Sequence, residues 1–253
     1  MKLIEVENYE QLSKKVAQMM SQTVKEKHNA VLGLATGGTV VGIYEELIRD
    51  HKQHKTSYKQ VRSVNLDEYI GLKKQHEQSY FSYMNDAFFK HVDIQSEHTH
   101  LPNGQAANIE EECERYEALI KNLGGIDLQL LGIGENGHIG FNEPGTAFDS
   151  RTHVIKLAES TRKANARFFE SFEEVPTHAI TMGIASIMSS KKIILAVSGE
   201  KKAEILYQLF HTDTTEDIPA TILKRHPDVT VIADKEALRI LMTKNERAEL
   251  FTS

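Results

Sequence analysis

Short apolar runs alternate with helical stretches along most of the chain, and this alternation is the strongest constraint on its fold. Residues 30–36 form one such run, and residues 8–28 before it repeat apolar side chains at helical spacing. Near-continuous apolar strands separated by helices are typical of a mostly parallel sheet covered on both faces. We therefore expect an α/β fold with a doubly wound sheet. Further strands are expected at 61–66, 126–133, 152–157, 177–182, 192–198 and 229–233, and further helices near 40–50, 78–90, 106–123, 160–171, 183–190, 200–211 and 234–241.

The domain organisation follows from length and composition. A chain of 253 residues has room for one large domain or two small ones. It contains no internal repeat, no low-complexity tract and no linker rich in Pro, Gly and Ser. We therefore expect one domain over residues 1–253, in which the helix near 160–171 is a candidate lid.

Charge and hydropathy exclude several classes of partner. The net charge of −6 is spread over interspersed acidic and basic residues and creates no field that would attract nucleic acid or an anionic membrane. No apolar run approaches the roughly 18 residues of a membrane span, and acidic residues interrupt the N-terminus, unlike a secretory signal. We expect a cytoplasmic protein that binds a small molecule. An anionic substrate would need positive charge gathered locally.

The single cysteine, Cys113, has no partner for an internal disulfide, which suits a reducing compartment. It lies between Glu112 and Glu114. Neighbouring carboxylates raise the pKa of a thiol, so we do not expect Cys113 to act as a nucleophile.

Polar residues that directly follow apolar runs are the candidates for a site, because open parallel sheets bind ligands outside the carboxyl ends of their strands. The first candidate is the segment Thr36-Gly37-Gly38-Thr39. Two glycines let backbone N–H groups approach an anion, and a following helix N-terminus adds a favourable dipole. The segment matches no nucleotide-binding pattern. It indicates either a phosphate site or a tight turn between strand and helix.

The second candidate is Asp67, followed by Glu68, directly after the run at 61–66. Asp and Glu are mostly exposed, so the pair could cap a helix or lie in water. A partly buried Asp67 could instead act as a general base.

The third candidate is the segment Leu131–Gly145, where glycines at 132, 134, 137 and 140 exclude a regular helix or strand. Asn136, His138 and Glu143 lie in this loop, and a carboxylate can orient an imidazole and stabilise its charged form. His98 and His100 alternate in another loop, but no matching Cys or carboxylate spacing accompanies them. We therefore predict no metal site.

Together these segments resemble the successive motifs of the glucosamine-6-phosphate deaminase family. The resemblance covers most of the chain. It implies a modified Rossmann-like α/β sandwich and an aldose–ketose isomerisation coupled to loss of ammonia. It rests on Thr36-Gly-Gly-Thr39, Asn65-Leu-Asp-Glu-Tyr-Ile-Gly71, Gly132-Ile-Gly-Glu-Asn-Gly-His-Ile-Gly-Phe-Asn-Glu-Pro144, Ser150-Arg-Thr, Thr161-Arg-Lys-Ala-Asn-Ala-Arg-Phe-Phe169 and Ser198-Gly-Glu-Lys-Lys-Ala203.

The resemblance also implies roles for single residues. Asp67 would take the C2 proton of the sugar and return it to C1. His138 would take the ring hydroxyl proton to open the sugar, supported by Glu143 and Asn136. No step needs a redox cofactor or a metal, so neither is expected. The residues expected around the 6-phosphate are Thr36, Gly37, Gly38, Thr39, Arg167 and Lys202.

The chain departs from the family pattern in two places. Some members carry Asp where this chain has Asn136, which leaves the supporting charge on His138 to Glu143. Regulated members bind an N-acetylated sugar phosphate at a second site with a basic cluster, where this chain has His153 and Ile155. We therefore do not expect this activation, and assembly into a homo-oligomer stays open.

Three alternative functions stay open. A lactonase acting on a 6-phosphogluconolactone shares the fold and the phosphate loop, but it needs no carbon base, so Asp67 favours the deaminase. A deaminase for galactosamine 6-phosphate differs by one hydroxyl contact that the sequence does not locate. A non-catalytic sugar-phosphate sensor has no use for Asp67, His138 and Glu143 together, and no helix-turn-helix segment precedes the sheet.

Overall fold

The computed structural model describes residues 1–157, 159, 162–163, 166 and 169–243. In this part of the chain, seven strands form a central sheet in the order β1-β10-β9-β6-β2-β3-β5, and every neighbouring pair is parallel. The mostly parallel α/β sheet expected from the sequence is confirmed. The strands of the central sheet are β1 (Lys2–Val6), β2 (Val31–Leu34), β3 (Arg62–Asn65), β5 (Thr99–His100), β6 (Leu128–Leu131), β9 (Ile193–Val197) and β10 (Val229–Asp234).

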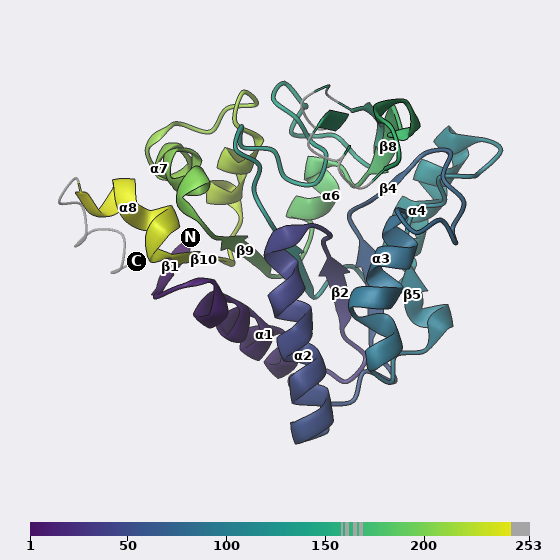
Figure 1. Ribbon diagram of the computed structural model, residues 1–253, viewed down its shortest axis with the longest axis horizontal. Coiled ribbons are helices and arrows are strands. Elements are labelled where there is room, and N and C mark those ends of the chain that lie inside the picture. The colour runs from purple at the N-terminus through teal and green to yellow at the C-terminus, as the bar shows by residue number, and fades with distance from the viewer. Residues whose placement is uncertain (158, 160–161, 164–165, 167–168, 244–253) are drawn as a thin grey trace.

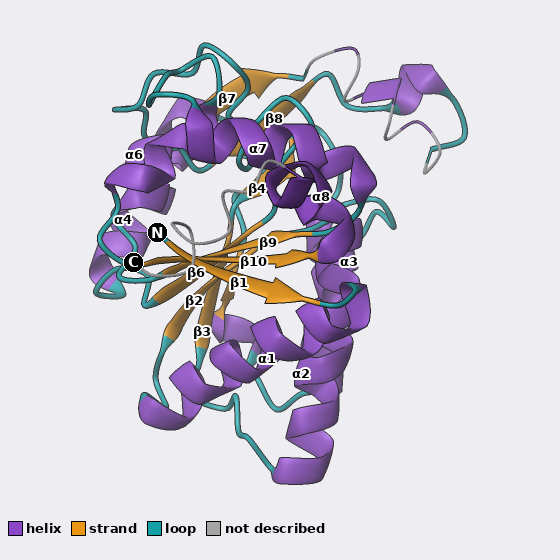
Figure 2. Cartoon of the chain, turned by 90° about the vertical axis from the view of Figure 1, so that its left-hand side faces the viewer, coloured by secondary structure: helices purple, strands orange, loops and turns teal. Residues whose placement is uncertain are grey.

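Helices cover both faces of this sheet, as Figure 2 shows, with α1 and α2 on one side and α6 and α7 on the other. The first helix begins at an Asn8 cap, whose side chain accepts the N–H of Gln11, and it buries Leu12, Val16 and Met20 at helical spacing. The helices are α1 (Tyr9–Glu26), α2 (Val41–His54), α3 (Tyr80–Ala87), α4 (Ile109–Asn122), α6 (Ile184–Met188), α7 (Ala203–His211) and α8 (Lys235–Thr243).

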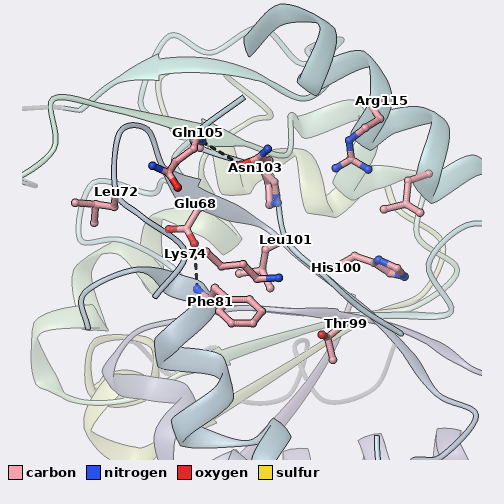
Figure 3. Close-up of a pocket in the computed structure, with 13 residues that line it drawn as sticks. Glu68, Leu72, Lys74, Phe81, Thr99, His100, Leu101, Asn103, Gln105 and Arg115 are labelled. Atoms are coloured by element: carbon pink, nitrogen blue, oxygen red, sulfur yellow. Dashed lines mark hydrogen bonds between the residues drawn. The ribbon is translucent and has the colours of Figure 1, made fainter. Parts of the chain in front are cut away.

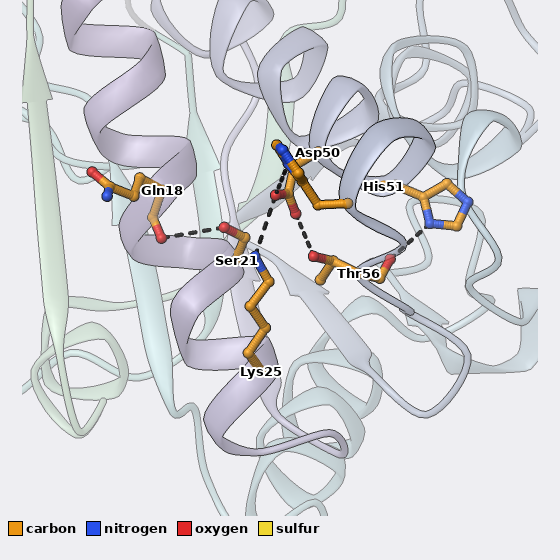
Figure 4. A network of polar contacts seen from close by, with 7 residues as sticks. Gln18, Ser21, Lys25, Asp50, His51 and Thr56 are labelled. Atoms are coloured by element: carbon orange, nitrogen blue, oxygen red, sulfur yellow. Dashed lines mark hydrogen bonds and ion pairs between the residues drawn. The ribbon is translucent and has the colours of Figure 1, made fainter.

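A polar network joins α1 to the end of α2 (Figure 4). Lys25 Nζ lies 3.3 Å from Asp50 Oδ1, and the Thr56 hydroxyl donates to the same carboxylate. The His51 ring lies 2.7 Å from the carbonyl oxygen of Thr56. Because Thr56 follows α2, these contacts fix the direction in which the chain leaves that helix.

The sheet changes its winding direction between β2 and β6. From β2 the chain crosses through α2 to β3 on one side, whereas β9, the next strand of the central sheet after β6, lies on the other side. The loops that follow β2 and β6 therefore leave the same edge of the sheet in opposite directions. This is the position at which doubly wound sheets form a ligand-binding crevice.

A second sheet lies at this carboxyl edge (Figure 1) and consists of β4 (Asp67–Tyr69), β8 (His178–Thr181) and β7 (His153–Lys156) in antiparallel pairing. We expected residues 152–157 and 177–182 to extend the mostly parallel sheet, which was wrong. In β7, half-buried and exposed residues alternate, as is typical of an antiparallel strand with one solvent-exposed face. The N–H of Met182 donates to the carbonyl of Leu66, which ties this sheet to the end of β3.

Three strands were absent from the sequence-based expectation: β1, β4 and β5. Strand β1 is an edge strand in which only Leu3 is buried, and β5 has two residues, so neither carries a long apolar run. The candidate lid near 160–171 lies partly outside the described residues. Among the described helices, none is long and apolar enough to cross a membrane.

Candidate active site

The loops that follow β2 and β6 line one cleft of about 180 Å³ at the carboxyl edge of the sheet. This is the crevice expected where the winding reverses. The cleft brings together all three segments that the sequence singled out. Its lining includes Thr36, Gly37, Gly38, Thr39, Asp67, Tyr80, Gly132, Gly134, His138, Gly140 and Phe141.

The loop after β2, called the glycine loop here (residues 36–39), is open toward solvent. Gly37 has φ of 108°, a conformation that a residue with a side chain rarely adopts. A Cβ atom added at Gly37 or Gly38 would meet no other atom within 4 Å. The loop thus leaves room for a ligand to approach its backbone closely.

The side chain of Asp67 lines the cleft from strand β4 and is only 6% exposed. Burial, helped by the neighbouring charge of Glu68, raises the pKa of Asp67 to about 8. A carboxyl group with a pKa this close to neutrality can exchange a proton with a bound molecule. Asp67 is therefore buried in the cleft and does not lie in water, and its role as a general base stays a prediction.

The adjacent carboxylate, Glu68, has a different environment. Its oxygens accept the backbone N–H groups of Tyr69, Tyr80 and Phe81, at 2.9, 2.9 and 3.0 Å. Because Tyr80 begins α3, this carboxylate caps that helix. Glu68 also borders a second cavity of about 340 Å³, shown in Figure 3, whose wall includes Lys74, His100 and Arg115.

The loop after β6 holds a group built around His138. Its Nδ1 lies 3.6 Å from Glu143 Oε2, and the Asn136 amide donates to the same oxygen at 2.7 Å. The Asn136 side-chain oxygen accepts the backbone N–H of His138 at 3.2 Å. The ring lies against Gly134, where an added Cβ would come within 2.3 Å of it. The sequence predicted this cluster, and the three side chains do lie together.

Glycine also brings this loop next to the buried carboxylate. A Cβ at Gly140 would lie 3.1 Å from Thr181 Oγ1 and 3.8 Å from Asp67 Oδ2. The Thr181 hydroxyl accepts the N–H of Phe141, and the buried Asn142 amide donates to the carbonyl of Met182. The end of β8 therefore anchors the loop that carries His138 beside the strand that carries Asp67.

Of the two cations expected to bind phosphate, Lys202 is the one that lies among the described residues. Lys202 ends the 3₁₀ turn Glu200–Lys202 after β9, on the same edge of the sheet, but it does not line the cleft. Burial lowers the pKa of Lys202, and the charge of Glu135 acts against this shift. Arg167 lies outside the described residues.

Sequence reasoning missed Tyr80, which lines the cleft. Its ring stacks on Phe141 with centroids 6.2 Å apart, and its hydroxyl donates to Tyr69 Oη at 3.2 Å. The capping residue Ser79 signals that a helix begins there. No local pattern indicates that the first side chain of that helix reaches a loop more than 40 residues away in sequence.

Two other expectations concern residues outside the cleft. Burial and the charges of Glu112 and Glu110 raise the pKa of the Cys113 thiol to about 11, so the predicted direction is confirmed and burial is its larger cause. Across the described part of the chain, no group of three or more His, Cys, Asp or Glu side chains could hold a metal ion.

Residues 5–232 match the family described as glucosamine-6-phosphate isomerases/6-phosphogluconolactonase. The chain belongs to this family. A member named glucosamine-6-phosphate deaminase from Geobacillus sp. (strain WCH70) is 58% identical over 241 residues, which span 95% of this chain and 96% of the relative. Glucosamine-6-phosphate deaminase 1 of Bacillus subtilis (strain 168) is 53% identical, with 94% of this chain and 98% of the relative covered.

Solved structures also resemble this chain. A structure described as a monomeric glucosamine-6-phosphate deaminase is 52% identical, has a TM-score of 0.93 and covers 95% of this chain and 100% of its own. A 6-phosphogluconolactonase from Thermotoga maritima has a TM-score of 0.71 at 20% identity, with coverage of 92% and 98%. The second likeness is one of fold alone.

Proposed function

We propose that the chain converts glucosamine 6-phosphate and water into fructose 6-phosphate and ammonia. One observation carries this proposal: a buried carboxylate, an imidazole paired with a second carboxylate, and an open glycine loop line the same cleft. Relatives named glucosamine-6-phosphate deaminase at 52–58% identity over nearly the whole chain support the same substrate.

The first step is opening of the sugar ring, because the C2 proton becomes acidic only beside a free carbonyl group. His138 takes the proton of the C1 hydroxyl, and the bond between C1 and the ring oxygen breaks while that oxygen gains a proton. An imidazole ring can both accept and release a proton, as this step requires. Glu143, 3.6 Å from the ring, stabilises the imidazolium that forms.

The second step moves a proton between two carbons. Asp67 removes the C2 proton from the open-chain aldehyde, while the C1 oxygen takes a proton from water to give an enol. Asp67 then delivers its proton to C1, while the amine nitrogen forms a double bond to C2 and returns one proton to water. The C2 amine becomes an imine, which water hydrolyses to the ketone and ammonia. One carboxylate can serve both carbons because they are adjacent. Its pKa of about 8 lets it hold the proton between removal and delivery.

The phosphate of the substrate would lie against the glycine loop, with Lys202 and Arg167 supplying positive charge. Backbone N–H groups and cationic side chains are the usual partners of a phosphate dianion, and this chain carries a net charge of −6 that would otherwise repel it. The proposed substrate ligands are therefore Thr36, Gly37, Gly38, Thr39, Arg167 and Lys202.

The proposal is tested by measuring ammonia and fructose 6-phosphate release from glucosamine 6-phosphate, with EDTA present and no cofactor added. We expect equimolar release of both products. Galactosamine 6-phosphate and 6-phosphogluconolactone serve as parallel substrates. Hydrolysis of the lactone without release from either amino sugar would contradict the proposal and leave Asp67 without a role as carbon base.

The proposal also covers the domain organisation, location, partners and oligomeric state of the enzyme. We infer one functional domain over residues 1–253, a cytoplasmic location and a small-molecule substrate without nucleic acid or membrane partners. The solved relative described as monomeric favours a monomer over the homo-oligomer that the sequence left open. Sedimentation of the purified protein measures this directly.

A further inference from the structure

Three tyrosine hydroxyls bond to the backbone at the start of the glycine loop. Tyr44 Oη donates to the carbonyl oxygen of Ala35 at 2.6 Å, and Tyr83 Oη donates to that of Gly37 at 3.0 Å. Tyr9 Oη donates to the carbonyl oxygen of Gly38 at 3.2 Å. None of the three tyrosines is among the residues that line the cleft, so they contact the loop from behind.

These bonds determine where the next N–H group points. In a trans peptide unit, the C=O of one residue and the N–H of the next point in opposite directions. A carbonyl held toward a tyrosine behind the loop therefore turns the following N–H away from that tyrosine. The three fixed carbonyls belong to residues 35, 37 and 38, so the N–H groups that they orient belong to Thr36, Gly38 and Thr39.

Two of the oriented N–H groups, those of Thr36 and Gly38, are available for a ligand. Among the residues that the structure describes, none accepts a hydrogen bond from the backbone N–H of Thr36, Gly37 or Gly38. An unpaired backbone donor at a binding loop is costly unless water or a ligand accepts from it.

The three tyrosines come from three separate helices. Tyr9 begins α1, Tyr44 lies within α2 and Tyr83 lies in α3. The Tyr9 hydroxyl also accepts the N–H of Gly42 at 2.8 Å, which joins the starts of α1 and α2. An added Cβ at Gly42 would lie 3.0 Å from this hydroxyl and 2.6 Å from Ser13 Oγ, so the close approach depends on glycine.

We propose that Tyr9, Tyr44 and Tyr83 are positioning residues for phosphate binding. They hold the carbonyl groups of residues 35, 37 and 38 away from the cleft and so turn the N–H groups that follow toward the substrate phosphate. The inference rests on the proposed function, because it assigns the glycine loop to the substrate phosphate. The tyrosines themselves touch no substrate. Their effect is on the affinity for the phosphate group and not on proton transfer.

The test uses variants that keep each ring and remove only the hydroxyl: Tyr9→Phe, Tyr83→Phe and the double variant, with Tyr44→Phe as a buried third case. KM and kcat for glucosamine 6-phosphate are measured alongside the Kd of inorganic phosphate by titration calorimetry. Tyr58→Phe is the matched control, because Tyr58 is fully buried, packs on Phe88 as Tyr44 does, and has a hydroxyl without a hydrogen-bond partner in the described structure.

We expect each single variant to raise both KM and the phosphate Kd about two- to tenfold, the net effect of one hydrogen bond, with kcat within about twofold of wild type. Tyr58→Phe should change none of these values. Unchanged KM and Kd in the double variant would overturn the inference, as would a fall in kcat without a rise in KM. A wild-type protein that binds phosphate but releases no ammonia would contradict the proposed function while the Kd values still test the tyrosines.

Discussion

Asp67 illustrates a conflict between stability and activity within one residue. Burial raises its pKa to about 8, so between the ordinary value for Asp near 4 and pH 8 the folded protein holds a proton that the unfolded chain releases. The folded state then binds more protons than the unfolded state. The contribution of Asp67 to the free energy of unfolding is therefore greatest below pH 4 and is lost as the pH rises toward 8.

Replacing the carboxyl by a neutral amide should separate these effects. We expect Asp67→Asn to abolish turnover while retaining phosphate binding, and to raise Tm at pH 8 by about 2–6 °C, because the cost of ionising a buried group is removed. The increase in Tm should shrink as the pH falls toward 4. Calorimetry across this pH range, together with the ammonia assay, provides the measurement. An active variant would remove Asp67 as the base.

Local sequence predicted the His138 group well because Asn136, His138 and Glu143 lie within eight residues of one another in a single loop. Glycines at fixed points of that loop restrict how the three side chains can meet. Tyr80 was missed because its place in the cleft depends on the direction in which α3 leaves β4. That direction is set by tertiary contacts and not by any local spacing.

At the scale of elements, the short strand β4 connects the site to α3. Successive side chains of a strand point to opposite faces. Asp67 accordingly lines the cleft, and Glu68 points to the other side, where it accepts three N–H groups. Sequence alone did not show this strand, because two adjacent carboxylates are typical of an exposed loop.

The Glu68→Gln variant tests this connection. A glutamine offers one acceptor oxygen in place of two and carries no charge, so we expect a stability loss of about 1–2 kcal/mol from the weakened cap. The charge of Glu68 raises the pKa of Asp67, so its removal should move the acid limb of kcat/KM to lower pH. A full pH–rate profile gives the result.

The control for this variant is Glu112→Gln. Glu112 is also a buried carboxylate that accepts a backbone N–H, that of Asn103 at 2.7 Å, but it lies on α4. The Glu112→Gln variant should lose stability without a shift of the acid limb of kcat/KM. An equal shift in both variants would show that the limb does not report on the charge beside Asp67.

At the scale of the whole molecule, the edge of the sheet opposite the cleft is held by Asp127. This carboxylate, 7% exposed, accepts both Lys27 Nζ at 2.7 Å and Lys191 Nζ at 2.7 Å, and it accepts the N–H of Val31 at 2.8 Å. The contacts join the end of α1, the start of β2 and the segment before β9. They lie at the amino ends of the strands, away from the cleft.

We expect Asp127→Asn to lower the free energy of unfolding by about 1–2 kcal/mol, a moderate value because both lysines are about half exposed. KM should not change. The partners lower the pKa of Asp127, so its contribution is present above the ordinary Asp pKa and is lost as the pH falls through the lowered value. Urea unfolding at pH 7 and pH 3 measures both effects. Asp86→Asn, which removes an exposed pair with Lys90, serves as the control.

The parallel core of the central sheet was predictable from the sequence, whereas the second, antiparallel sheet was not. Apolar runs at β2, β3, β6, β9 and β10 are long enough to be recognised, and their alternation with helices gave the parallel core. The antiparallel sheet at the carboxyl edge was not predictable, because β7 and β8 resemble the other strands in length. Only their pairing with the three residues of β4 distinguishes them.

The burial of Cys113 gives the chain a practical advantage for spectroscopy. With a thiol pKa of about 11, only about one thiol in ten thousand is ionised at pH 7, and the side chain is 6% exposed. A maleimide dye would therefore react far faster with a cysteine introduced at an exposed position such as Glu135, in the loop beside the cleft. Fluorescence from that position could follow substrate entry in an otherwise unmodified enzyme.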